Sequence, residues 1–372
     1  MSRFILIAGG TGGHLFPAMA LAQELQRRGH VVELMTDHRV EAYGADFPAK
    51  AIHIVPSATP SGANLVKAAG AGVTILRGVA KAYGVFAKGK PAAVVGFGGY
   101  PTFPPFIAAK LAGVPGILHE QNAVMGRANR ALTRFAHTLA LSFANTKFAD
   151  AQKVNSVVTG NPARDRVRAV AGRPYPALDA VGPIRLVVTG GSQGARFTSD
   201  IVPAAIALLP ETLRSRLQIV QQARPEDIDR VTEAYRQSRT NVELSSFIPD
   251  LPERIANSHL VIGRSGASTV NELCIIGRPA ILIPLPGALD SDQKYNGQVL
   301  EEGGGGWVME QDTLSPQSLA TRLQNLFSNP AKLQQAAEAA RALGQPQAVE
   351  RLADLAEKTV GLAPKTNEGT PS

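Results

Sequence analysis

The chain has 372 residues, of which 44% are hydrophobic and 18% charged, a soluble globular composition large enough to bury two full cores. Its single cysteine, Cys274, excludes a disulfide framework, is typical of a cytoplasmic protein and is expected to be a small buried residue. The formal net charge of +8 lies almost entirely in the first 165 residues, and basic stretches suit nucleic acid, anionic lipid or a phosphorylated partner. Met1-Ser-Arg-Phe4 leads directly into a predicted strand, so we expect neither a secretory signal nor a transit sequence.

Short β-branched strands alternate with helical stretches along the whole chain. In the first half, strands are predicted near 4–8, 31–35, 51–55, 93–97, 116–119, 138–142 and 156–159. In the second half, they are predicted near 184–189, 217–221, 242–245, 259–263 and 279–284. Helices are predicted at 16–28, 126–135, 196–209, 226–239, 267–276, 293–302 and 315–328. This alternation predicts an α/β protein built from two doubly wound, Rossmann-like parallel sheets.

The division between the two domains is predicted at Gly160-Asn-Pro-Ala-Arg164, because a proline-rich linker follows it. This gives an N-terminal domain over 1–163 and a C-terminal domain over 164–345. An Ala/Gln/Glu-rich stretch predicts a terminal helix over 346–362. Residues 363–372 are expected to form a disordered tail.

A glycine-rich turn, Gly9-Gly-Thr-Gly-Gly13, joins the first predicted strand to the first helix. Small residues at a helix N-terminus leave backbone N–H groups free to bind phosphate or another anion. His14 follows directly, and the positive end of the helix disfavours its charged form, so it is expected to be neutral and able to accept a proton. A turn of this kind can also serve only to pack a helix on a strand, and a lone histidine is often structural.

Residues 64–90 interleave lysine and arginine with apolar residues, and no acidic residue lies between Asp46 and Glu120. The pattern predicts a helix with an apolar and a cationic face, which favours a membrane surface. An ordinary amphipathic helix packed on the sheet is an equal alternative. The uncharged run 91–109 is interrupted by glycine and proline, so it predicts a strand, a turn and a helix start rather than a membrane span.

Four consecutive polar residues, His119-Glu-Gln-Asn122, follow the strand predicted near 116–119. Such groups need hydrogen-bond partners, and either a ligand or a hydrogen-bonded loop would supply them. Gly96-Phe-Gly-Gly-Tyr100 is similar, because its glycines allow close approach and are followed by an aromatic ring with a polar tip.

The second half repeats the strand–glycine–helix unit at Gly190-Gly-Ser-Gln-Gly194, which could hold a diphosphate without a metal. The stretch 264–272 adds another helix N-terminus and, about one turn later, a carboxylate suited to a ribose diol. Two such turns suggest two α/β domains that face a shared cleft.

Asp290-Ser-Asp292 matches a short acidic signature that holds a divalent metal in one class of nucleotide-sugar enzymes. No further carboxylates cluster around it in the sequence, and we expect neither a metal nor another cofactor. There is no Walker phosphate loop, no nucleophile elbow and no zinc spacing. Neither glycine turn has the full dinucleotide-binding spacing, which disfavours an NAD-dependent oxidoreductase.

Taken together, these stretches resemble one family, the MurG N-acetylglucosaminyltransferases, which complete lipid II in bacterial cell-wall synthesis. Seven matching stretches occur in order over nearly the whole chain: Gly9-Gly-Thr-Gly-Gly-His14, Gly98-Gly-Tyr100, His119-Glu-Gln-Asn122, Gly160-Asn-Pro-Ala-Arg164, Gly190-Gly-Ser-Gln-Gly-Ala195, Arg264-Ser-Gly-Ala267 and Gln293 to Asn296. Each stretch is weak alone, but the ordered set is specific. The resemblance implies a GT-B glycosyltransferase, whose two Rossmann-like domains face a cleft. Its N-terminal domain would take a lipid-linked acceptor at the membrane, and its C-terminal domain would bind UDP-N-acetylglucosamine.

The resemblance also implies which residues contact the phosphates of the donor. Ser192 and its neighbours would contact the diphosphate, together with Thr11, Gly12 and Gly13 across the cleft. Arg164 would lie near the same phosphates.

Further residues would bind the sugar and the nucleotide. Asn122 and Gln293 would hold the sugar, and Ile248 would meet the uracil. The nucleotide would be lined by one helix start, with its last residue on the ribose: Ala267, Ser268, Thr269, Val270, Asn271 and Glu272.

On the acceptor side, the resemblance makes His14 the candidate for assisting the acceptor hydroxyl, with Tyr100 and Glu120 nearby. Two stretches there depart from the family. Pro101-Thr-Phe-Pro-Pro105 replaces a small, glycine-containing stretch, and Ser57-Ala-Thr-Pro-Ser-Gly62 replaces a glycine-rich basic loop. The resemblance therefore supports the contacts to the acceptor less well than the contacts to the donor.

The implied enzyme is a hexosyltransferase that moves N-acetylglucosamine, with inversion and without a metal, from its UDP donor to the 4-hydroxyl of N-acetylmuramoyl-pentapeptide-diphospho-undecaprenol (lipid I). It would be peripheral, on the cytoplasmic face of the inner membrane, and would contact anionic lipids. Its expected partners include other cell-wall synthesis proteins but no nucleic acid, and its pathway serves cell shape and cell division.

Two other interpretations stay open. UDP-N-acetylglucosamine epimerases use the same architecture without a lipid acceptor, so an epimer formed from the donor alone would identify one. A catalytically silent nucleotide-sugar-binding partner of a cell-wall assembly complex is the other, and a turnover assay would decide against it.

Overall fold

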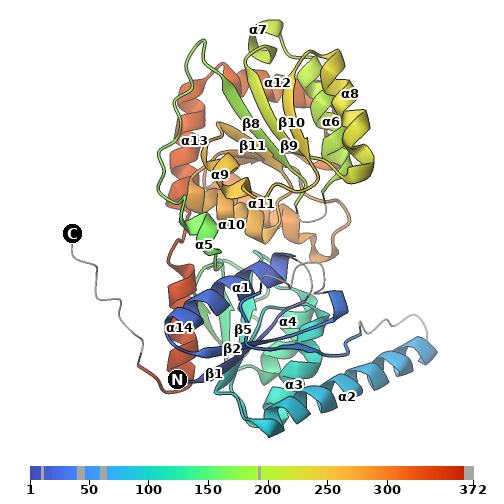
Figure 1. Ribbon diagram of the computed structural model, residues 1–372, viewed down its shortest axis with the longest axis vertical. Helices are drawn as coiled ribbons and strands as arrows, with labels where there is room; N and C mark the ends of the chain where they lie inside the picture. The colour runs from blue at the N-terminus through green and yellow to red at the C-terminus, as the bar shows by residue number, and fades with distance from the viewer. Residues whose placement is uncertain (10–11, 40–46, 59–64, 192–193, 364–372) are drawn as a thin grey trace. The chain divides into compact units, whose positions relative to one another are not determined.

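The computed structural model describes residues 1–363 except 10–11, 40–46, 59–64 and 192–193. The chain forms two compact units (Figure 1): Met1–Arg164 together with Gln347–Ser372, and Asp165–Pro346. The boundary therefore lies one residue after the predicted end of the N-terminal domain. The terminal helix belongs to the first unit, although it follows the second unit in the sequence.

Within its described residues, the first unit contains a parallel seven-stranded sheet of order β3-β2-β1-β4-β5-β6-β7. The strands are β1 (Arg3–Ile7), β2 (Val31–Thr36), β3 (Ile52–Ile54), β4 (Ala93–Gly96), β5 (Gly116–Glu120), β6 (Thr138–Leu141) and β7 (Asn155–Val158). Each strand predicted in the first half of the sequence is present. After β3 the chain returns to the other side of β1, so the sheet has a topological switch point between β1 and β4.

Helices cover both faces of this sheet. They are α1 (Gly12–Arg27), α2 (Leu65–Lys88), η2 (Tyr100–Thr102), α3 (Phe103–Leu111), α4 (Arg127–Leu132), η3 (Thr133–Phe135) and α14 (Ala348–Thr359). Alternate residues of a strand point to opposite faces. Phe4 and Leu6 therefore pack in a core with α1 and α14, whereas Ile5 and Ile7 pack in a second core with α2 and α3.

The part of the second unit that the structure describes has a parallel six-stranded sheet of order β10-β9-β8-β11-β12-β13. Its strands are β8 (Ile184–Thr189), β9 (Leu217–Gln222), β10 (Asn241–Ser245), β11 (Leu260–Gly263), β12 (Ala280–Leu282) and β13 (Gly306–Val308). The sequence predicts the first five but not β13. This strand has three residues and follows a run of glycines, so it has no hydrophobic pattern of its own, and it forms by pairing with β12.

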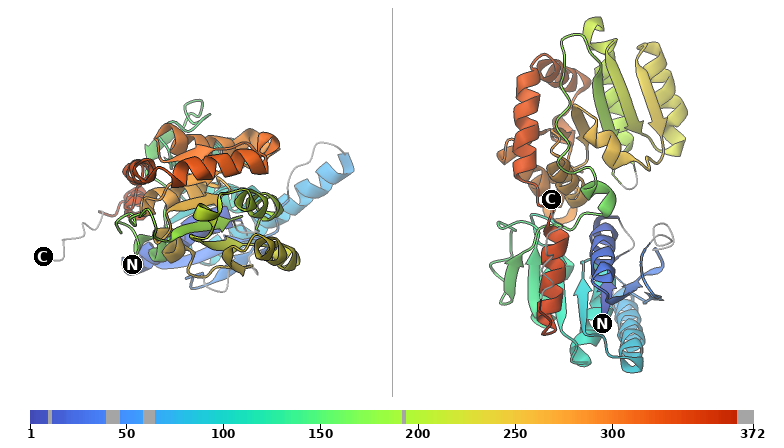
Figure 2. Two further views of the ribbon diagram at one scale, coloured as in Figure 1. Left: turned by 90° about the horizontal axis from the view of Figure 1, so that it is seen from above. Right: turned by 60° about the vertical axis from the view of Figure 1, so that its left-hand side comes forward.

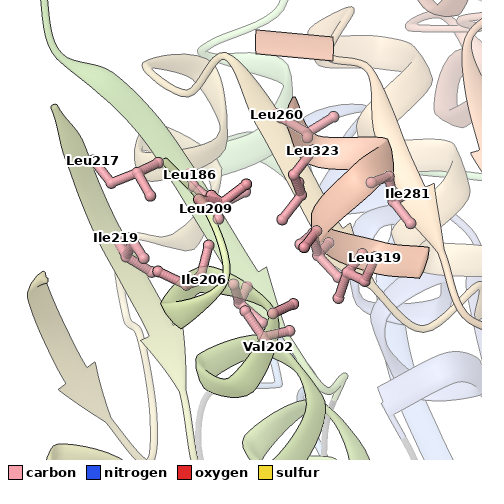
Figure 3. Packing of buried hydrophobic residues seen from close by; sticks show 14 of the residues in the cluster. Leu186, Val202, Ile206, Leu209, Leu217, Ile219, Leu260, Ile281, Leu319 and Leu323 are labelled. Atoms are coloured by element: carbon pink, nitrogen blue, oxygen red, sulfur yellow. The ribbon is translucent and has the colours of Figure 1, made fainter. Parts of the chain in front are cut away.

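The helical elements of this unit lie before, between and after its strands. They are α5 (Asp165–Arg168), α6 (Arg196–Ala207), α7 (Glu211–Arg214), η4 (Pro225–Asp227), α8 (Ile228–Gln237), α9 (Leu251–Ala256), α10 (Ala267–Ile276), η5 (Leu289–Ser291), α11 (Asp292–Glu302), η6 (Gln311–Thr313), α12 (Pro316–Phe327) and α13 (Pro330–Ala342). Figure 3 shows part of the core, where Leu319 and Leu323 of α12 lie near Leu260 and Ile281 of the sheet. The fold predicted from the alternation of strands and helices is thus confirmed in both units.

None of the helices in the described part of the chain has the length and apolarity needed to cross a membrane.

Candidate active site

In the first unit, three predicted polar stretches meet at one edge of the sheet. β1 pairs with β4, and β4 pairs with β5, all in parallel, so their carboxyl ends are neighbours. His14 follows β1, the Gly98–Tyr100 turn follows β4, and Asn122 follows β5. Ligands of open α/β sheets bind at the carboxyl ends of strands beside a switch point.

His14 is a neutral imidazole in the first turn of α1. It is half-buried, and its ring lies against the backbone of Gly99, where an added Cβ would be 3.4 Å from its Cε1. Burial and, second, the positive charge of Arg39 lower the pKa of His14 to about 4. The neutral form expected from the sequence is therefore supported by burial and a neighbouring cation.

The start of α1 is open beside this ring. Gly12 is buried and Gly13 exposed, and a Cβ on Gly13 would meet no atom within 4 Å. Thr11, the third predicted residue of this turn, lies outside the described residues.

The turn after β4 depends on its glycines. Gly98 and Gly99 have φ of +87° and +74°, a backbone conformation that favours glycine. The Gly98 carbonyl accepts a hydrogen bond from Thr102 Oγ1 at 2.6 Å, and the Phe97 carbonyl accepts one from Gln121 Nε2 at 3.0 Å. Tyr100 is half-buried and begins η2.

The His119–Asn122 stretch divides into three internal residues and one that reaches the surface. His119 Nε2 donates to the Gly160 carbonyl at 3.0 Å, and Gln121 Nε2 lies 3.1 Å from His119 Nδ1. Burial lowers the pKa of His119 to about 4. Glu120 is 1% exposed, whereas Asn122 is half-buried. Hydrogen bonds within the protein thus account for the first three residues, whereas the Asn122 side chain, although bonded to Glu120, is partly exposed.

Arg164 lies close to the start of α1. Its Cζ is 3.8 Å from the centroid of the Phe16 ring, a cation–π contact, and Phe16 is two residues after His14. The residue predicted to lie near phosphates is therefore beside the helix that begins at the first glycine turn.

In the second unit, the Gly190–Gly194 turn joins β8 to α6. A Cβ on Gly190 would overlap the backbone nitrogen of Ala195, and Gly191 and Gly194 have φ of +80° and +67°. Ala195, the N-cap of α6, makes no side-chain cap, which leaves the first N–H groups of this helix for another partner. Ser192 lies outside the described residues.

Helix α10 begins in the same way, with Gly266 as an N-cap that has no side-chain cap. Of the six predicted nucleotide residues on α10, Ser268, Thr269 and Asn271 are half-buried, whereas the others are buried. Val270 is 0% exposed, so its side chain packs in the core rather than facing a ligand. Glu272 is 8% exposed.

Gln293 and Ile248 follow other strands of this sheet. Gln293 Oε1 accepts a hydrogen bond from the Leu285 backbone N–H at 3.0 Å, which ties α11 to the segment after β12. Ile248 follows β10 and is 9% exposed. Both positions lie after carboxyl ends of strands.

The Asp290-Ser-Asp292 stretch forms the entry to α11. Asp290 and Ser291 have φ of 66° and 53°, which is strained for residues with side chains. Burial, and to a lesser degree the charge of Asp290, raises the pKa of Asp292. In the parts of the chain that the structure covers, no group of three or more His, Cys, Asp or Glu side chains is placed to hold a metal ion.

The sequence did not predict two polar residues that lie around this edge of the sheet, Arg39 near His14 and Asn129 beside Gly98. Arg39 follows β2 and forms an ion pair with Asp37 at 2.6 Å. Asn129 of α4 is 2% exposed and lies against Gly98. The rule that polar residues after strand ends form sites would have selected Arg39, but no local signal marks Asn129, because its contact depends on packing of two separate loops.

Comparison with known families supports this division into two units. The glycosyltransferase family 28 N-terminal domain matches residues 4–141, and the glycosyltransferase family 28 C-terminal domain matches residues 185–356.

Curated relatives carry the name UDP-N-acetylglucosamine--N-acetylmuramyl-(pentapeptide) pyrophosphoryl-undecaprenol N-acetylglucosamine transferase. The relative from Methylorubrum extorquens (strain PA1) is 52% identical over 357 residues, which cover 95% of this chain and 97% of the relative. The relative from Allorhizobium ampelinum is 51% identical over 353 residues, covering 95% and 94%.

Among solved structures, Acinetobacter baumannii MurG superposes with a TM-score of 0.78 at 29% identity, covering 96% of this chain and 100% of that one. The UDP-GlcNAc 2-epimerase from Neisseria meningitidis, bound to UDP-GlcNAc, has a TM-score of 0.68 at 15% identity, covering 96% and 100%. The likeness to the epimerase shows the shared fold alone.

Proposed function

The chain belongs to the MurG family, within glycosyltransferase family 28, and is a UDP-N-acetylglucosamine-dependent glycosyltransferase of peptidoglycan synthesis; from this premise we propose that it converts lipid I to lipid II. It transfers N-acetylglucosamine to the 4-hydroxyl of N-acetylmuramoyl-pentapeptide-diphospho-undecaprenol, with inversion and without a metal ion.

The observation that carries the proposed chemistry is a neutral His14 at the switch point of the first sheet. A neutral imidazole accepts the proton of the acceptor hydroxyl while the hydroxyl oxygen bonds to the anomeric carbon of the donor. The bond from that carbon to the diphosphate breaks at the same time, and UDP leaves with the electron pair from the opposite face. The new linkage is therefore β from an α-linked donor.

The second unit supplies groups suited to the leaving diphosphate. The uncapped N-termini of α6 and α10 present backbone N–H groups to an anion. Such preorganised donors act on developing negative charge as an oxyanion hole does, for about 3–4 kcal/mol per donor in well-studied cases. In this proposal Arg164, Gly12, Gly13, Thr11 and Ser192 contribute to the same stabilisation.

The other predicted residues have binding roles in the proposal. Asn122 and Gln293 hold the sugar, Ile248 meets the uracil, and Glu272 binds the ribose. The remaining residues of the α10 start line the nucleotide, and Val270 does so through its backbone because its side chain is buried.

We further propose that α2 brings this enzyme to the membrane as a peripheral protein. Val73, Leu76 and Tyr83 of α2 are 49%, 69% and 46% exposed. At 3.6 residues per turn they lie within about 80° of one another. The side chains of Ala82 and Phe86, which pack in the core, lie on an adjoining face that is centred about 110° away around the helix.

A cationic stripe runs beside this apolar stripe. Arg77, Lys81 and Lys88 are exposed and lie within about 40° of one another on the helix. Exposed apolar side chains next to cations suit an anionic bilayer surface. Packing on the sheet uses the adjoining face of α2, so it does not account for these two stripes. Because lipid I carries a polyprenyl chain, contact with the inner leaflet places the enzyme at its acceptor, on the cytoplasmic face and in reach of other cell-wall synthesis proteins.

The test of the proposed reaction is transfer of labelled N-acetylglucosamine from its UDP donor to a lipid I analogue. We expect a product whose anomeric proton coupling identifies a β linkage. An epimer formed from the donor alone would support an epimerase instead, and no turnover of either kind would support a silent binding protein.

A further inference from the structure

Glu120 is a buried carboxylate surrounded by N–H groups of the loop that follows β5. Its Oε1 accepts hydrogen bonds from the backbone nitrogen of Asn122 at 3.0 Å and from Asn122 Nδ2 at 3.1 Å. Its Oε2 accepts from the backbone nitrogen of Gly126 at 3.0 Å and from Asn129 Nδ2 at 2.8 Å. These contacts close the loop 121–126 onto the end of its own strand.

Asn129 joins this loop to the turn after β4. Its Nδ2 also donates to the His119 carbonyl at 3.2 Å, so this nitrogen bonds both the Glu120 carboxylate and the backbone of β5. A Cβ built on Gly98 would be 3.2 Å from Asn129 Nδ2 and 3.3 Å from Asn129 Oδ1. The Asn129 amide therefore lies beside the Gly98 backbone, where a larger residue would place its Cβ.

The turn after β4 also lies beside the imidazole of His14. Gly99 is the next residue, and a Cβ on it would lie 3.4 Å from His14 Cε1 and 3.7 Å from Nδ1. Glu120 is thus hydrogen-bonded to Asn129, Asn129 lies beside Gly98, and the next residue, Gly99, lies beside His14. Asn122, the half-buried residue assigned to the sugar, is held by Glu120 itself.

We infer that Glu120 and Asn129 are positioning residues for the transfer: they form a buried bracket that sets Asn122 and, through the Gly98–Gly99 turn, His14. This inference rests on the proposed functions of Asn122 and His14. With an exposed fraction of 1%, Glu120 acts through Asn122 and the turn and not by contact with the acceptor. This replaces the direct acceptor-side role that the sequence analysis assigned to it.

The carboxylate is suited to this task because each oxygen accepts two N–H groups. Glutamine has one accepting oxygen, so its Nε2 would face two of the donors and separate from them. Misplacement of reacting groups by about 1 Å costs on the order of 100-fold in rate. The bracket therefore predicts a loss in kcat from changes that leave every substrate-contacting side chain in place.

The experiment measures kcat and both KM values, for UDP-N-acetylglucosamine and a lipid I analogue, in Glu120→Gln, Asn129→Ala and the double variant. We expect kcat to fall about 10- to 100-fold in each single variant, with KM for the donor nearly unchanged. The double variant should lose little more than the worse single one, since residues of one network are not additive.

Glu33→Gln is the matched control. Glu33 is a buried carboxylate of the same sheet, 9% exposed, which accepts from Arg3 Nε at 2.8 Å and contacts His53 Nε2 at 2.8 Å. Its variant should keep the wild-type kcat. Hydrogen exchange should speed up in segments 97–100 and 121–126 for Glu120→Gln but not for Glu33→Gln.

Wild-type kcat in a folded Glu120→Gln protein would overturn the bracket. So would an inactive Glu120→Gln beside a fully active Asn129→Ala, which would give the carboxylate a chemical role of its own. If Glu120→Gln does not fold, Asn129→Ala and Gly98→Ala, which drives a methyl group against the Asn129 amide, decide by the same kcat criterion. A wild-type protein that transfers no sugar would refute the proposed function and not the bracket alone.

Discussion

At the scale of single residues, burial rather than residue type decides which polar groups are available for chemistry. His119, Glu120 and Gln121 are each 2% exposed or less and are hydrogen-bonded within the protein, whereas His14 and Asn122 reach the surface. Adjacent residues in one polar stretch thus have different roles. The sequence could predict the stretch, but the directions of the His119 and Gln121 side chains depend on the segments after β7 and β4.

Replacement of His14 tests its role in proton transfer. We expect His14→Ala to lower kcat by about 10²–10⁴-fold, because a general base contributes that much, with little change in KM for the donor. Steady-state kinetics with a lipid I analogue checks this. His53→Ala, which removes a histidine paired with Glu33 outside the site, should retain the wild-type kcat, and near-normal turnover by His14→Ala would contradict the assignment.

The pH dependence follows from the lowered pKa of His14. Its proton-accepting form predominates above a pKa of about 4, so kcat/KM should stay level as the pH falls from 8 to 5.5. A histidine with the ordinary pKa of about 6.5 would lose roughly 10-fold over the same interval, because protonation removes the base. A loss of that size, in protein shown by circular dichroism to stay folded, would contradict a lowered pKa of His14.

At the scale of elements, helices of the first unit serve two surfaces at once. Helix α2 buries Ala82 and Phe86 in the core and exposes Leu76 and Tyr83. Gly78 allows its close approach, since a Cβ there would lie 2.8 Å from Pro104 Cβ. Helix α14, the red helix in the unit that carries the N-terminus in Figure 2, packs on the same core as α1. The periodicity of 64–90 predicts the faces of α2, but no local pattern assigns α14 to the first unit.

Charge reversal on α2 tests the membrane proposal. Lys81→Glu with Lys88→Glu should weaken binding to vesicles of anionic phospholipid, measured by co-sedimentation. The loss of each lysine should cost about 1 kcal/mol of binding free energy, and repulsion by the new carboxylates adds to this loss. Lys153→Glu with Lys358→Glu makes the same charge change at exposed positions outside α2 and should have a smaller effect. Binding that ignores both the lipid charge and the α2 reversal would refute the proposal.

An ion cluster between α1 and α14 predicts a large stability effect. Arg28 is 9% exposed and contacts Glu24 Oε1 at 2.7 Å, Glu357 Oε2 at 2.7 Å and Asp354 Oδ1 at 2.6 Å. Arg28→Met removes the cation that these carboxylates share and leaves Glu24 with Arg27 and Glu357 with His30. We therefore expect a loss of about 3 kcal/mol, the low end for breaking a buried ion pair. Urea unfolding checks this. Arg236→Met, which breaks an exposed pair with Glu233, should leave the stability nearly unchanged, because solvent screens such pairs.

At the scale of the whole molecule, the chain enters the second unit after Arg164 and returns to the first at Gln347. Both units have the doubly wound parallel sheet that their sequences predict. In the proposed mechanism the proton acceptor, His14, belongs to the first unit and the N-termini of α6 and α10 belong to the second, so each unit alone lacks part of the chemistry. The full chain is therefore the species to assay.

Metal removal tests how the leaving group is stabilised. We expect EDTA to leave the initial rate of transfer unchanged and added magnesium not to raise it, because backbone N–H groups and arginine carry the charge in our mechanism. The measurement is turnover of labelled donor with a lipid I analogue. Loss of turnover in EDTA that magnesium restores would show that a metal is needed and would contradict this mechanism.

Local sequence patterns predict the two sheets, because apolar strands and amphipathic helices alternate with periods that local chemistry sets. They also predict the positions of His14 and the two glycine turns, since strand–glycine–helix units are local. Three features are visible only in the folded chain: β13 pairs with β12, α14 belongs to the first unit, and Glu120 is enclosed by Asn122, Gly126 and Asn129. Each of these features depends on contacts between segments that are separate in the sequence. Such contacts produce no periodic pattern of residue types, so they cannot be predicted from local sequence.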